Sequence, residues 1–291
     1  MSEPASSIDQ NELASSAAGN PDAAQDLYGL GIRIGLYFQA LGWILYSYSD
    51  RKGLRLASGS ITIPILISWF IFASKQLFSP CEAFIILVIL ASLNFPAKAT
   101  LQNFEFKEIN TEATGVLMLL LVELGICSAL LWLFSTLVNN LPTLQTENVT
   151  FFFAKVSFTG WFRILALIYC VLDAATSIWF CYKVYRAYYW PGKEDPRKIL
   201  KPEPVYYSLY WAVWLLVVLG VELTIKWNRL APVTDFQSPG QLIPFITGII
   251  ILVDSILVAG NEIGNRISKI LDAFTGATSS RKTQPPTLSY P

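Results

Sequence analysis

Histidine is absent from this 291-residue chain, and charged residues make up only 14% of it. Without histidine, the chain lacks the commonest metal ligand and the usual general base at neutral pH. A soluble domain carries about 25% charged residues, so the low content indicates a membrane environment. The net charge is zero, which argues against a nucleic-acid partner. We therefore expect the lipid bilayer as the main partner, no nucleic acid and no cofactor.

Cysteine is also scarce, and no two cysteines form a CxxC pair. Neither a zinc site nor a disulfide framework is indicated, so we expect no bound metal. Residues 1–27 are polar and acidic and lack the basic start and apolar core of a signal peptide. This composition predicts a disordered acidic tail over 1–27, and a second disordered tail is expected over 276–291.

Long apolar segments are abundant, since 53% of the residues are hydrophobic. A bilayer core needs about 20 mostly apolar residues per helix. Such segments predict an all-α bundle of seven transmembrane helices over residues 28–261. We place the spans near 28–49, 58–77, 80–97, 115–138, 161–183, 205–226 and 240–261. Apolar residues at helical spacing beside Arg266 and Lys269 predict a cytoplasmic amphipathic helix over 262–275, lying on the inner leaflet.

Lysine and arginine are distributed unequally between the two sides of this bundle. Fifteen of the 21 lie in connections on one side, mostly in 50–57, 184–204 and the carboxyl-terminal segment. Because cytoplasmic loops carry the basic excess, we expect the amino terminus outside or lumenal and the carboxyl terminus in the cytoplasm. The sequon Asn148-Val149-Thr150 falls in an expected outer loop, so Asn148 is a candidate glycosylation site.

Four carboxylates interrupt the last four spans: Glu123, Asp173, Glu222 and Asp254. An ionised acid at mid-bilayer costs about 3 kcal/mol on insertion scales, so an intramembrane acid is a candidate functional residue. We expect Asp173 and Asp254 to face an internal polar site, because each has polar neighbours at helical spacing. Those neighbours are Cys170, Thr176 and Ser177 for Asp173, and Thr247 and Asn261 for Asp254.

Basic partners for these acids are all near the expected outer end. Arg33 and Arg163 lie early in spans one and five, and Lys226 follows Glu222 by one turn. We expect an outer network of these four residues, in which Glu222 and Lys226 form an i,i+4 pair. Arg33, Glu123, Arg163, Asp173, Glu222 and Asp254 are therefore the candidate ligand-binding residues. The alternative is that the polar groups only bind helices together, each hydrogen bond contributing about 0.6 kcal/mol.

Three stretches resemble a group of multi-pass membrane proteins of filamentous fungi. They are DLYGLGIRIGLYFQ at 26–39, VELTIKWN at 221–228 and GQLIPF at 240–245. The resemblance covers most of residues 26–275 and implies an integral membrane protein of the plasma membrane or an endomembrane. It assigns no activity and no functional residue. A weaker likeness, in span count and buried carboxylates only, is to the membrane terpene cyclases of fungal secondary metabolism.

Three functions fit these observations. In the first, the protein senses or moves a small or lipid-like ligand through a polar intramembrane cavity. In the second, a protonated Asp173 or Asp254 acts as general acid on a small apolar substrate, since a carboxyl group held neutral in an apolar site is a good donor. In the third, the chain is a scaffold that recruits partners through its basic inner loop.

Overall fold

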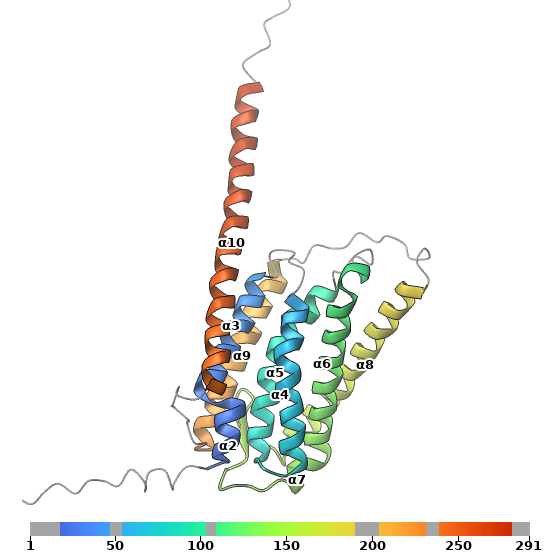
Figure 1. Cartoon of the computed structure of the whole chain (residues 1–291), viewed down its shortest axis with the longest axis vertical. Coiled ribbons are helices and arrows are strands. Elements are labelled where there is room, and N and C mark those ends of the chain that lie inside the picture. Colours follow the sequence, from blue (N-terminus) through green and yellow to red (C-terminus); the bar gives the residue numbers. More distant parts are fainter. Residues whose placement is uncertain (1–17, 47–53, 103–108, 190–203, 231–238, 281–291) are drawn as a thin grey trace, which may run out of the picture.

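The computed structural model describes residues 18–46, 54–102, 109–189, 204–230 and 239–280. Seven long helices stand side by side in this part of the chain (Figure 1). They are α3 (Leu30–Tyr46), α4 (Leu54–Ser74), α5 (Pro80–Gln102), α6 (Ile109–Trp132), α8 (Trp161–Tyr189), α9 (Pro204–Trp227) and α10 (Pro239–Ser280). A π-helical turn, η3 (Leu133–Leu137), and the short α7 (Val138–Asn140) continue α6. Every predicted apolar segment overlaps one of the long helices.

Four helical segments are long and apolar enough to cross a membrane: Thr114–Asn140, Trp161–Trp179, Leu209–Trp227 and Pro239–Asn261. Shorter apolar stretches occupy Gly59–Ser74 and Pro80–Pro96 of α4 and α5. Large apolar side chains on α8 and α10 point away from the bundle, including Ile168, Leu172, Ile250 and Leu257. The prediction of a helical membrane protein is confirmed at this level, because a bilayer is the solvent that accepts such surfaces.

Consecutive long helices run in opposite directions. Hydrogen bonds at one end of the bundle join the end of α4 to the segment before α3, and the end of α6 to the start of α8. At the same end, the start of α3 meets the start of α10 through a bond from Gly31 N–H to Gln241 Oε1. The carboxyl-terminal end of α10 lies far away at the opposite end (Figure 1).

The segment before α3 is ordered from residue 18, so the prediction of a disordered tail over 1–27 is wrong for 18–27. Ala18 forms a parallel bridge with Leu230, and α2 (Pro21–Ala23) and the π turn η1 (Ala24–Tyr28) follow. Ala23, Leu27 and Tyr28 are buried in the apolar core. This short amphipathic segment was missed because its apolar residues are few. Residues 1–17 lie outside the described part of the chain.

Helices α3 and α10 pack unusually closely, through glycine. A Cβ atom added to Gly35 would lie 2.3 Å from the carbonyl oxygen of Pro244, and one added to Gly248 would lie 2.3 Å from the carbonyl oxygen of Gly35. Gly31 and Gly35 form a Gly-x-x-x-Gly pair on α3. Small residues at this spacing let two membrane helices approach until their backbones touch.

Helix α10 is continuous over 42 residues, and in Figure 1 it extends well beyond the other helices. The predicted helix over 262–275 is therefore helical, but it is the end of α10 and not a separate element. Residues 276–280, expected to be disordered, also belong to α10, and 281–291 lie outside the described residues.

A β-hairpin follows α7 and precedes α8 in the sequence, and it packs against the carboxyl-terminal end of α9. Strands β1 (Val149–Phe151) and β2 (Lys155–Ser157) pair antiparallel, with Thr150 opposite Val156. Asn228 at the end of α9 fixes this hairpin, because its side-chain amide accepts from the Val149 N–H at 3.1 Å and donates to the Val149 carbonyl at 2.7 Å. The side chain thus makes the two bonds that a neighbouring strand would make.

Candidate functional site

Three potential ligand side chains meet where α6 faces α8. Glu123 and Cys127 are one turn apart on α6, and Asp173 comes from the middle of α8. One carboxylate or sulfur atom of each lies within 4.8 Å of the other two. Cys127 Sγ donates to Asp173 Oδ2 at 3.2 Å. Glu123 and Cys127 are buried and Asp173 is half-buried, so two of the predicted acids share one site with a cysteine.

Asn94 of α5 completes this group, which we call the acid cluster (Asn94, Glu123, Cys127 and Asp173). Its Nδ2 donates to Glu123 Oε2 at 2.7 Å. The side chain is only 1% exposed, and Asn94 Oδ1 has no hydrogen-bond partner. A buried amide oxygen without a partner costs free energy, which makes it a marker of an unusual local environment.

The polar neighbours of Asp173 do not extend the cluster along α8 as predicted. Thr176 Oγ1 and Ser177 Oγ donate to the backbone carbonyl of Asp173 at 2.8 and 2.9 Å. Hydroxyl groups in membrane helices often satisfy their own backbone in this way. Their helical spacing therefore reflects local backbone bonding.

Asp254 does not share a site with Asp173, so the expected common internal site is not formed. Asp254 is exposed on the surface of α10 and accepts a hydrogen bond from the Tyr46 hydroxyl of α3. Helix α10 packs along α3, whereas α8 packs along α6. The sequence places both acids at mid-span but does not say which helices are neighbours.

Arg33 and Glu222 form an ion pair between α3 and α9. Arg33 Nε lies 2.9 Å from Glu222 Oε1, and the Tyr37 hydroxyl donates to the same oxygen at 3.1 Å. The guanidinium also donates to the carbonyl of Tyr28 at 2.8 Å, and Arg33 is almost fully buried. Of the predicted outer network, this pair is formed. Glu222 pairs with Arg33 on another helix, and Lys226, its predicted i,i+4 partner, is exposed.

Arg163 occupies a different place from the one expected in that network. Its guanidinium donates to the carbonyls of Phe134 and Ser135, both at 2.6 Å, and to Asn139 Oδ1 at 3.1 Å. The π-helical turn at 133–137 frees carbonyl groups that an α-helix would satisfy. A cation near a helix carboxyl terminus also interacts favourably with the negative end of the helix dipole, so Arg163 is a structural cap.

Asn148, the candidate glycosylation site, lies directly before β1 and is half-buried. Its Oδ1 accepts from Thr146 Oγ1 at 3.0 Å. Thr150 of the same sequon is buried, and its hydroxyl is bonded to Thr224 Oγ1 at 3.1 Å. In the folded chain the sequon is thus part of the contact between hairpin and α9.

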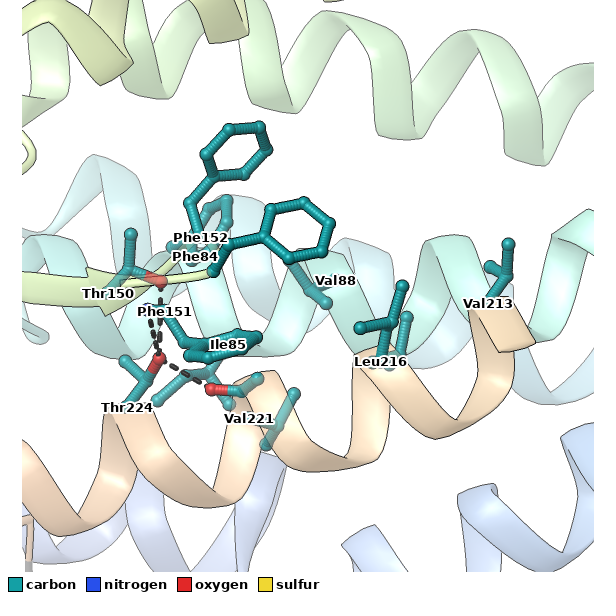
Figure 2. Close-up of a pocket in the computed structure, with 13 residues that line it drawn as sticks. Phe84, Ile85, Val88, Thr150, Phe151, Phe152, Val213, Leu216, Val221 and Thr224 are labelled. Atoms are coloured by element: carbon teal, nitrogen blue, oxygen red, sulfur yellow. Dashed lines mark hydrogen bonds between the residues drawn. The ribbon is translucent and has the colours of Figure 1, made fainter. Parts of the chain in front are cut away.

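A separate apolar cavity of about 210 Å³ lies between α5, α9 and the hairpin (Figure 2). Its walls are aromatic and aliphatic, and they include Phe84, Val88, Phe152, Leu216 and Val217. The hydroxyls of Thr150 and Thr224 lie at one end and are bonded to each other (Figure 2). None of the four predicted intramembrane acids lines this cavity.

Sequence reasoning missed three polar residues that the fold uses. Asn94 and Cys127 lie within apolar runs, and the only signal for them in the sequence is that each is a polar residue among apolar ones. Glu82 is fully buried and accepts from Ser79 N–H and Oγ, from Tyr28 Oη at 2.6 Å and from Asn20 N–H. The signal for Glu82 was present, because Ser79-Pro80-Cys81-Glu82 is a capping-box pattern.

The fold and the cluster define a class: a helical membrane protein with an acidic polar site between its helices. Comparison of the chain with protein-family models, curated proteins and solved structures gave no match.

Proposed function

We propose that the chain crosses the membrane seven times, with its amino terminus outside or lumenal and its carboxyl terminus in the cytoplasm. Two observations support the proposal. The seven long helices alternate in direction, so an odd number of crossings puts the two ends on opposite sides. The excess of Lys and Arg belongs to the connections at the end of the bundle opposite the hairpin.

We infer that this protein binds a small polar or cationic ligand at the acid cluster, in order to sense it or to move it. The observation that carries this inference is the approach of Glu123, Cys127 and Asp173 within 4.8 Å, midway along α6 and α8. Gathering acids inside a membrane is costly, so the arrangement favours a function over a purely structural contact. Hydrogen bonds alone would bind the helices as well with neutral residues.

Flux and binding assays with the purified full chain test this function. Vesicles containing the protein, loaded with pH- and cation-sensitive dyes, are compared with empty vesicles and with vesicles holding Asp173→Asn. Asp254→Asn is the matched control, because Asp254 lies on another helix pair. We expect flux that Asp173→Asn abolishes and Asp254→Asn retains. Flux equal to that of empty vesicles would remove the transport version, and ligand-induced thermal stabilisation then tests the sensing version.

A lipid-like ligand is a second candidate, supported by the apolar cavity between α5 and α9. The cavity of about 210 Å³ has aromatic and aliphatic walls, which suit part of an acyl chain. Val217→Trp would fill it, whereas Leu219→Trp changes an exposed position of α9 outside the lining. Copurified lipid measured by mass spectrometry should fall with the first variant alone. Equal lipid retention in both variants would contradict this candidate.

The alternative of an acid-catalysed enzyme of secondary metabolism requires Asp173 or Asp254 beside an apolar substrate. The cavity of Figure 2 is lined by neither residue. Asp254 lies on an exposed helix face, and Asp173 faces a cysteine and a glutamate. The geometry thus favours binding at the acid cluster over catalysis.

A further inference from the structure

The acid cluster has the size of an ion site. We propose that Glu123, Cys127, Asp173 and Asn94 bind one divalent transition-metal cation of the zinc class. This deepens and rests on the proposed function, since it names the ligand of the same site. The chain has no histidine and no CxxC pair, and its sequence spacing gave no indication of this site.

The spacing of the ligand atoms fits such an ion. Zinc lies about 2.3 Å from a thiolate and about 2.1 Å from a carboxylate oxygen, so tetrahedral ligand atoms are about 3.3 to 3.8 Å apart. Cys127 Sγ and Asp173 Oδ2 are already 3.2 Å apart, and all three ligand atoms lie within 4.8 Å of one another. A carboxylate shift of about 1 Å would therefore bring the widest allowed separation to this spacing.

Asn94 supplies an independent observation. Its Oδ1 is buried without a partner while its Nδ2 touches Glu123 Oε2 at 2.7 Å. Turning the amide by 180° exchanges the two atoms at almost no change in shape. The oxygen would then stand beside the carboxylate, where a shared cation would bind both. In that orientation the amide oxygen would face the Glu123 carboxylate, a contact between two acceptors that a shared cation would make favourable.

The mixture of ligands selects the class of metal. Carboxylate and amide oxygens alone would suit magnesium or calcium, but a cysteine sulfur favours softer ions. One sulfur with oxygen ligands matches zinc or its spectroscopic substitute cobalt(II). A divalent ion would offset two of the three negative charges on the deprotonated Glu123, Cys127 and Asp173, which lowers the cost of holding them inside a membrane.

Cobalt(II) titration of the purified full chain in detergent tests the site, because a thiolate-bound cobalt ion has a charge-transfer absorption band. We expect one cobalt bound per chain, displaced by zinc and unaffected by excess magnesium. Cys127→Ser should abolish the band, and Asp173→Asn should weaken binding tenfold or more. Cys170→Ser is the matched control, since Cys170 is equally buried one turn from Asp173 but outside the cluster, and it should keep the band.

Thermal unfolding without metal checks that each variant is folded. Asn94→Asp is a second probe, which replaces the neutral amide oxygen by a charged carboxylate oxygen and should tighten binding. No band in the wild-type chain, or a band that survives Cys127→Ser, would overturn the proposal. If metal does not bind but Asp173-dependent flux persists, the ligand is another cation and the proposed function stands. If metal binds without flux, the transport version alone fails.

Discussion

Glu82 is the carboxylate on which the fold depends most. It accepts hydrogen bonds from residues before α3 and from the cap of α5, so one side chain joins two segments 54 to 62 residues apart. Hydrogen bonds to a charged group contribute about 1.5 to 3 kcal/mol each when buried. The carboxylates of this chain therefore divide into structural ones, such as Glu82, and those of the acid cluster.

Glu82→Gln should destabilise the protein by on the order of 3 kcal/mol, because the new amide nitrogen would face a donor. Unfolding in mixed micelles, followed by circular dichroism, measures the change. Glu147→Gln is the control, since Glu147 is exposed. Equal stability of the two variants would show that the cap does not hold the amino-terminal segment.

The pKa of Glu147 is lowered from its ordinary value of 4.5 by a hydrogen bond from Lys155. A carboxyl group with a lowered pKa stabilises the folded state above its unfolded pKa, and the effect disappears as the pH falls through the folded pKa. Because the pair is fully exposed, the effect should be small and should vanish in high salt. The melting curves of Glu147→Gln and wild type should differ slightly at pH 6, and the difference should shrink as the pH falls below 4.5. A difference that grows on acidification would contradict this assignment.

At the scale of elements, the contact of α3 with α10 is set by glycine. Packing between membrane helices relies on close van der Waals contact, because lipid provides no hydrophobic driving force between them. Gly248 touches the backbone of Gly35, while Gly260, further along α10, has nothing within 4 Å of its added Cβ. The two positions form a matched pair on one helix.

Gly248→Ala should cost about 1 to 3 kcal/mol, since the new methyl group would overlap the backbone of α3. Gly260→Ala should be neutral or stabilising, because alanine is the better helix former. Limited proteolysis and thermal melts distinguish the two variants. If both melt at the wild-type temperature, the close approach of α3 and α10 is wrong.

The elements were predictable where a mostly apolar segment runs for 18 residues or more, as in Thr114–Asn140 and Pro239–Asn261. The neighbours of each helix were not predictable, because pairing depends on surface shapes that arise only on packing. Asp173 and Asp254 show this limit: both lie at mid-span in the sequence, but one faces α6 and the other faces Tyr46 of α3. Glu222 had a partner one turn away in sequence and a better one across the bundle.

At the scale of the whole molecule, the two ends of the bundle should face opposite compartments. A single cysteine placed at exposed Thr159 in a cysteine-free background should react with an impermeant thiol reagent added outside intact cells, and one placed at exposed Ser268 of α10 should not. Asn148 should gain a glycosidase-sensitive glycan if it is modified during synthesis. If Ser268→Cys were labelled from outside, the orientation of the chain would be opposite to the one proposed.

Helices α6 and α8 bring Cys127 and Asp173 together, away from Asp254. Thiol crosslinking tests it most directly, in a chain where Cys81, Cys170 and Cys181 are replaced by serine. With Asp173→Cys, oxidation should join the new thiol to Cys127 in one chain, as peptide mass spectrometry would show. With Asp254→Cys, no such link should form. A crosslink from position 254, or none from position 173, would contradict the account.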